Sequence, residues 1–193
     1  MTTSVEGSPD FNVTHKLPKI IGIPLNWSLK VMKLITLISG CVMAFTFFFV
    51  VVVRYGFQGD LFAYEEWLMA IAFWGFFAGA VIASEKKLHI NADILGIIIT
   101  DPKVAWQRQL VVLTIELVVI ATIAYWGYLM VADEFEYYPR WKMTPALKIP
   151  FVVWRGAIFI GFIYMTIFAA AHLYVHIKEG ISRTGKIEGE AKT

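Results

Sequence analysis

The chain has 193 residues, of which 58% are hydrophobic and 17% are charged, with a mean hydropathy of +0.64 and a formal net charge of +2. Soluble domains carry about 45–50% apolar and about 25% charged residues, so this composition excludes an ordinary soluble globular protein. The small net charge argues against nucleic-acid binding, and the single cysteine, Cys41, excludes an internal disulfide.

Long apolar stretches, separated by short clusters of charge, dominate the chain. In chain order they are Val31–Val53, Leu61–Ser84, Gln109–Val131 and Ile149–Val175. Each reaches the roughly 20 residues that a helix needs to cross the hydrocarbon core, where backbone polar groups must pair within the segment. We therefore predict an all-α integral membrane protein with four transmembrane helices. Residues 1–30 are expected to form a cytoplasmic or interfacial segment, 31–176 the membrane domain and 177–193 a polar cytoplasmic tail.

A shorter amphipathic segment lies between the second and third spans. Its isoleucines recur on one helical face, at Ile90, Ile94, Ile97 and Ile98. His89 and Asp93 are four residues apart, which suits a charge-assisted contact on the helix surface, and Pro102 favours an end to the segment. We predict a short interfacial helix here, with His89 and Asp93 as its polar motif.

Lysine and arginine are distributed unevenly between the two sides of such a protein. One side would carry Lys16, Lys19, Lys30, Lys33, Lys86, Lys87, Lys103, Arg108, Lys178, Arg183, Lys186 and Lys192, and the other only Arg54, Arg140, Lys142 and Lys148. Cytoplasmic loops are the ones enriched in Lys and Arg. The pattern predicts that both termini are cytoplasmic.

Several ionisable residues fall inside or at the edge of the predicted spans. Such a group costs about 2.5–3.5 kcal/mol at a helix centre on insertion scales, so it usually faces protein and has a partner. Glu65, Glu66 and Arg155 all lie within roughly 10 Å of the outer boundary. We expect Arg155 to pair with Glu65 or Glu66, with Arg54 joining from the rim; a transport or proton-relay role is the alternative. Glu116 lies near the opposite boundary, so its partner is expected elsewhere, such as on another subunit.

Aromatic and small residues mark two further candidate contacts. The outer segment Asp133–Lys148 is rich in aromatic residues, including Tyr137, Tyr138 and Trp141, and is a candidate interface with a periplasmic partner. In the second span, Gly75 and Gly79 match the small-xxx-small spacing of closely packed helices.

Three histidines leave a different function open. His172 and His176 are four residues apart at the end of the fourth span, and His89 is expected on the same side, so a pair of them could ligate haem. We find no nucleophile–base pair, phosphate loop or metal-ligand cluster, so we predict neither an enzyme nor a cofactor.

Several short motifs occur together around the second span. They are Arg54-Tyr55-Gly56-Phe57, Tyr64-Glu65-Glu66, Gly75 with Gly79, and His89-Ile90-Asn91-Ala92-Asp93. In this order the sequence resembles the small membrane (Q-type) subunit of tripartite ATP-independent periplasmic (TRAP) transporters. Arg155 is not part of the resemblance.

The resemblance implies a scaffold subunit of the bacterial inner membrane with defined partners. These are a large membrane subunit, which carries the substrate and ion sites, and a periplasmic binding protein, which delivers an organic acid. The segments Asp133–Lys148 and Arg54–Asp60 would face the binding protein. The alternatives are a haem-bearing membrane anchor of a respiratory enzyme and a small transporter that acts alone through Glu116 and Arg155.

Overall fold

The computed structural model describes residues 19–59, 61–86 and 102–190. In these ranges the chain forms four helices, α1 (Lys19–Gly56), α2 (Tyr64–Glu85), α4 (Pro102–Glu136) and α5 (Val152–Glu190). Each is long and apolar enough to cross a membrane, which confirms the predicted all-α membrane fold. The predicted interfacial helix, with His89 and Asp93, lies outside the described residues.

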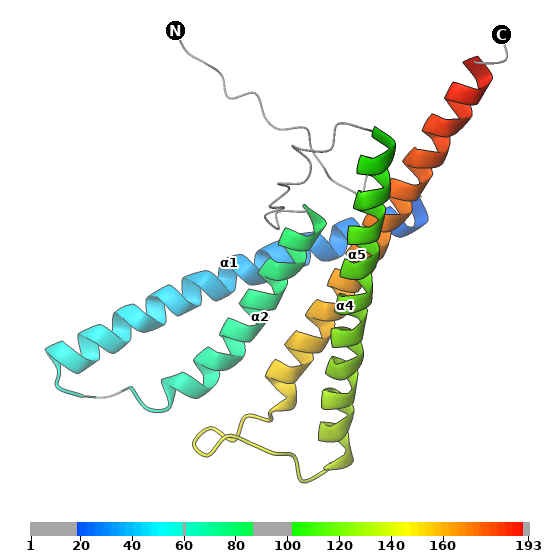
Figure 1. The fold of residues 1–193 in the computed structure, drawn as a ribbon. Coiled ribbons are helices and arrows are strands. Elements are labelled where there is room, and N and C mark those ends of the chain that lie inside the picture. Colours follow the sequence, from blue (N-terminus) through cyan, green and yellow to red (C-terminus); the bar gives the residue numbers. More distant parts are fainter. Residues whose placement is uncertain (1–18, 60, 87–101, 191–193) are drawn as a thin grey trace, which may run out of the picture.

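The helices run alternately in opposite directions (Figure 1). As a result, α1 begins and α5 ends at one end of the molecule, which we call the terminal end. The α1–α2 connection and the α4–α5 loop, residues 137–151, lie at the opposite end, which we call the loop end.

Three helices, α1, α4 and α5, extend well beyond the predicted apolar runs. α1 has 38 residues and α5 has 39, which corresponds to lengths of about 57–58 Å at 1.5 Å per residue. Residues 19–30, which belong to the segment expected to be cytoplasmic or interfacial, form the first turns of α1. Pro24 is tolerated there, and Leu25 and Leu29 are buried. Burial of these two leucines explains why the helix continues through a proline that removes one backbone hydrogen bond.

The four helices form a row and not a closed bundle. α1 packs on α2, α2 packs on α5, and α5 packs on α4 (Figure 1). The buried side chains that the first three helices of this row share are Leu25, Leu29, Met32, Ala78, Val81, Met165 and Phe168. They come from the first half of α1, the second half of α2 and a part of α5 just before its middle, so on α1 and α2 the apolar core lies toward the terminal end.

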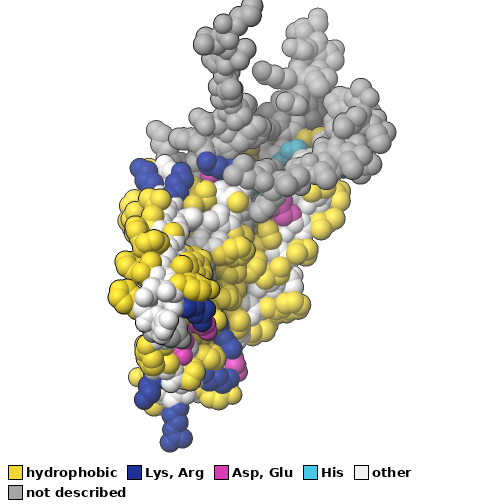
Figure 2. All heavy atoms as spheres, turned by 90° about the vertical axis from the view of Figure 1, so that its left-hand side faces the viewer, with side chains coloured by type: hydrophobic (Ala, Val, Ile, Leu, Met, Phe, Trp, Pro, Cys, Tyr) yellow, Lys and Arg dark blue, Asp and Glu magenta, His cyan; other side chains and the backbone are white. Residues whose placement is uncertain are grey.

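Little of the apolar surface is buried inside this one chain. In the most apolar window of each helix, 28% of α5 is buried but only 17% of α1 and 11% of α4. The two outer helices of the row therefore turn most of their apolar side chains outward. Figure 2 shows one side of the molecule, with hydrophobic side chains over much of it and Lys and Arg side chains near its upper edge and in its lower half.

The closest approach between α1 and α2 depends on a glycine. A Cβ atom added at Gly75 would lie 2.5 Å from Ser39 Cβ, whereas one added at Gly79 would lie 3.7 Å from Thr36 Cγ2. The glycine pair thus faces α1, but only Gly75 is required by lack of space.

Substitution Gly75→Ala should destabilise the protein by about 1–3 kcal/mol, because the new methyl group overpacks the contact with Ser39. Gly40→Ala is the matched control, since nothing lies within 4 Å of that position. Thermal unfolding in detergent should show a lower Tm for Gly75→Ala alone; equal Tm values for the two variants would contradict the close contact.

Candidate functional site

A buried ion pair joins α4 to α5 near the loop end. Arg155 Nη1 contacts Glu134 Oε1, and the Glu134 side chain is only 2% exposed. The expectation that Arg155 pairs with Glu65 or Glu66 is therefore wrong. The reason is that α4 continues beyond Val131 to Glu136, which keeps Glu134 on the helix.

Helical spacing would have placed Glu134 on the face of α4 that meets α5, but the predicted end of this helix at Val131 left Glu134 outside it. A Cβ added at Gly127 would lie 3.5 Å from Phe159 Cα, so this side of α4 faces α5. Glu134 follows Gly127 by two helical turns and so lies on the same face. Placing Glu134 in the loop concealed this relation.

Trp74 makes the second polar link between helices, from α2 to the first turn of α5. Its indole Nε1 donates a hydrogen bond to the Val153 carbonyl oxygen over 3.1 Å. A tryptophan in the middle of a span needs such an acceptor because its N–H has no water partner there. The bond holds the start of α5 against α2.

Glu66 makes the third link, from the first turn of α2 to the α4–α5 loop. Its Oε1 accepts a hydrogen bond from the Ala146 backbone N–H over 2.9 Å, and its Oε2 accepts one from Leu147 N–H over 2.7 Å. The Thr144 side chain adds a hydrogen bond to the same carboxylate. One carboxylate of α2 thus holds a segment that is 80 residues further along the chain.

The loop that Glu66 holds is folded back on itself. Thr144 N–H donates to the Ile149 carbonyl over 3.0 Å, and Ile149 N–H donates to Thr144 Oγ1 over 2.9 Å. Phe151 N–H donates to the Lys142 carbonyl over 3.0 Å. These bonds make residues 145–148 a tip, in which Lys148 has a φ of 53°.

The remaining charged candidates stay apart from these links. Glu65 and Arg54 are exposed, and Glu116 is half-buried on α4. In the part of the chain that the structure describes, none of the three forms an ion pair. Of the residues expected around Arg155, only Glu66 contributes a contact between segments, and its partners are two backbone N–H groups and the Thr144 side chain.

Aromatic residues cover the loop next to this link. Trp141 is half-buried and packs edge-on against Phe135 and Tyr138, with ring centroids 6.0 and 6.1 Å apart. Lys142 Nζ lies 4.3 Å from the centre of the Tyr137 ring and 3.9 Å from Asp133 Oδ2. Tyr138 is 71% exposed, so this residue, more than Trp141, is available to a partner.

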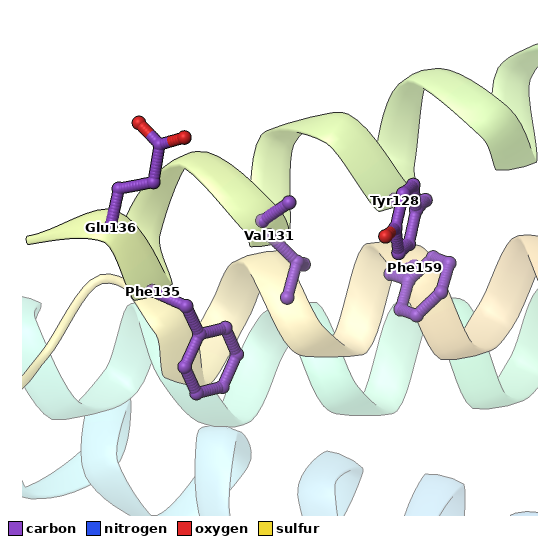
Figure 3. Close-up of a pocket in the computed structure, with 6 residues that line it drawn as sticks. Tyr128, Val131, Phe135, Glu136 and Phe159 are labelled. Atoms are coloured by element: carbon purple, nitrogen blue, oxygen red, sulfur yellow. The ribbon is translucent and has the colours of Figure 1, made fainter. Parts of the chain in front are cut away.

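A shallow groove of about 610 Å³ runs between α4 and α5 at this end, lined by Tyr128, Val131, Ala132, Phe135, Glu136 and Phe159 (Figure 3). The rings of Tyr128 and Phe159 lie against each other, while Glu136 points away from α5. The walls are apolar and the one charge is a carboxylate. An organic anion would therefore find no cation to recognise it among the residues that line this groove.

At the terminal end, the two histidines of α5 are bound to neighbouring backbone. His172 Nε2 lies 3.2 and 3.1 Å from the carbonyl oxygens of Ser84 and Glu85, at the last turn of α2. His176 Nε2 lies 3.2 Å from the Trp106 carbonyl, and the two rings stack at 5.5 Å. In each ring Nε2 acts as a donor to a carbonyl and is not presented as a lone pair to iron. This geometry disfavours the haem-anchor alternative, and His89 lies outside the described residues.

The long apolar helices, the small internal core and the polar links between helices define the class as a multi-pass α-helical membrane protein. A family model for the DctQ component of tripartite ATP-independent periplasmic transporters matches residues 42–179. The chain belongs to this family of transporter components, which is not an enzyme family, and the resemblance seen in the sequence is confirmed. No curated protein matches the chain in a sequence search.

Substitution Arg155→Ala should destabilise the protein by about 3–5 kcal/mol, because it leaves the buried Glu134 carboxylate without its partner. The exchange Arg155→Glu with Glu134→Arg should recover much of this loss, whereas Arg155→Glu with Glu66→Arg should recover none. Thermal unfolding of the purified variants in detergent measures both. Recovery by the Glu66 exchange would overturn the assigned pair.

Proposed function

We propose that the chain is a scaffold for the large transport subunit and that its loop end helps to dock a periplasmic binding protein, for ion-coupled uptake of an organic acid. The transporter family supplies the class of these partners. The observation that carries the scaffold role is the outward-facing apolar surface of α1 and α4, the two outer helices of the row.

The scaffold role also fits the internal polar groups of the spans. Arg155 is neutralised by Glu134, and the indole N–H of Trp74 is satisfied by Val153. A transport pathway needs polar groups that face a cavity and bind ions or substrate in turn. These two residues are instead engaged in fixed contacts between helices, which suits a support for a moving partner.

Glu116 marks the face of α4 that we propose for the large subunit. It lies among outward-facing apolar residues, with Val112 four residues before it and Val119 three residues after it. A carboxylate on such a face is unfavourable in lipid unless a polar group meets it. A donor on the large subunit would satisfy this requirement, so Glu116 would serve as a polar anchor at the interface.

The direction of the helices follows from the Lys and Arg distribution. We place the terminal end in the cytoplasm and the loop end in the periplasm of a bacterial inner membrane. Residues 54–59 and the α4–α5 loop then lie on the side where a binding protein arrives. Exposed Tyr55, Phe57 and Tyr138 give this end the aromatic character of a protein interface.

Substitution Glu116→Leu should reduce the amount of large subunit that co-purifies with the chain, because it removes the proposed polar anchor. The isolated chain should keep its thermal stability, since Glu116 forms no ion pair in the described structure. Thr122→Val is the matched control: it removes a polar group from the exposed part of the same helix, but that hydroxyl already donates to Val118. Unchanged co-purification of Glu116→Leu would contradict the anchor.

The double substitution Tyr137→Ala with Tyr138→Ala should raise the binding-protein concentration needed for half-maximal uptake in proteoliposomes, by roughly tenfold if the pair forms an interface hot spot. Co-purification of the large subunit should not change, because both residues lie in the loop. Phe76→Ala, on an exposed part of α2, is a suitable control for loss of an aromatic ring. An unchanged half-maximal concentration would remove these tyrosines from the docking surface.

A further inference from the structure

We propose that Glu66 is the positioning residue for docking: it holds the tip of the α4–α5 loop, residues 145–148, in the conformation that the periplasmic binding protein recognises. This inference rests on the proposed function and adds a specific residue to it. Glu66 would not itself contact the binding protein; it would act through the backbone of the loop.

Glu66 accepts hydrogen bonds from backbone N–H groups of the loop tip. The Ala146 and Leu147 N–H groups each donate to a different oxygen of its carboxylate, over 2.9 and 2.7 Å. Hydrogen bonds to an ionised acceptor are shorter and stronger than neutral ones. Two such bonds, together with the Thr144 hydrogen bond, fix both the position and the orientation of the tip relative to α2.

The link is informative because α2 is otherwise remote from the loop in the chain. The loop is covalently attached to α4 and α5. Glu66 also attaches it to α2, which packs on the other side of α5 in the row. Trp74 makes a second connection from α2, through its hydrogen bond to Val153 at the start of α5. The loop tip therefore depends on how α2 and α5 pack.

The tip has a conformation that its own sequence does not favour. Lys148 has a φ of 53°, which non-glycine residues adopt rarely and only where the surrounding structure enforces it. The Glu66 bonds precede Lys148 directly, and the Thr144–Ile149 bonds enclose it. Without the carboxylate, the loop would lose a contact that keeps Lys148 in this unfavourable conformation.

The tip presents a small surface of mixed character. Leu147 is 40% exposed, and Lys148 and Ala146 are also exposed. An apolar side chain beside a cation is complementary to a partner surface that combines an apolar patch with a carboxylate. We expect the binding protein to carry such a patch where it meets the tip.

The test compares Glu66→Gln with Glu65→Gln in the complete transporter. Glutamine keeps the size of the side chain but removes the charge and one of its two acceptor oxygens, so the loop bonds should weaken. Glu65 is the matched control, because it is an exposed carboxylate one residue away with no contact to the loop in the described structure. Uptake in proteoliposomes is measured against binding-protein concentration, and hydrogen–deuterium exchange is measured on the peptide that contains Ala146 and Leu147.

For Glu66→Gln we expect faster exchange of the loop amides and a roughly tenfold higher half-maximal binding-protein concentration, equivalent to about 1.4 kcal/mol of docking free energy. The maximal rate and the co-purified large subunit should match the wild-type chain and Glu65→Gln. A loss in maximal rate alone would indicate a merely structural role and overturn the inference.

The remaining outcomes separate this inference from the proposed function. Unchanged exchange in Glu66→Gln would show that the carboxylate does not hold the loop. Faster exchange with unchanged half-maximal concentration would show that the held conformation is not recognised. Uptake by the wild-type complex that does not depend on a binding protein would instead defeat the proposed function, whatever the exchange data show.

Discussion

The buried ion pair between Arg155 and Glu134 sets how α4 lies against α5, and the rest of the loop end depends on it. A guanidinium in the first turns of a membrane helix needs a partner, and a carboxylate as enclosed as Glu134 needs one equally. Since removing either charge leaves the other buried, the two helices are held in one relative register. This register also sets the position of the loop that joins the two helices.

The molecule is held together differently at its two ends. Toward the terminal end, α1, α2 and α5 share an apolar core that includes Val81 and Phe168, both fully buried. The hydrogen bonds of His172 and His176 add to that core. Toward the loop end, polar contacts hold the helices together, through Trp74, Glu66 and Arg155. Lipid offers little drive for apolar helices to associate, so close packing and polar links carry the contact. A row of helices arranged this way keeps two outer faces free, which suits a scaffold subunit.

Sequence patterns located the important charges better than they identified the contacts between them. Arg155 stood out because a cation inside a span requires a partner, but Glu134 was assigned to the loop since the apolar run ended before it. Glu66 stood out for the same reason as Arg155, yet it binds backbone N–H groups at Ala146 and Leu147. Backbone donors have no side-chain identity, so no residue pattern in the loop indicates that they receive a carboxylate.

The number and type of the membrane-spanning helices were determined by the sequence alone, because hydrocarbon requires every backbone group of an apolar run to pair within its own helix. The family was likewise evident from motifs in the residues 54–95. Only the tertiary structure decided the order of the helices in the row, the continuation of α1 back to Lys19 and the partners of Arg155 and Glu66. These features depend on which faces meet across segments distant in the chain, and hydropathy describes each segment without its neighbours.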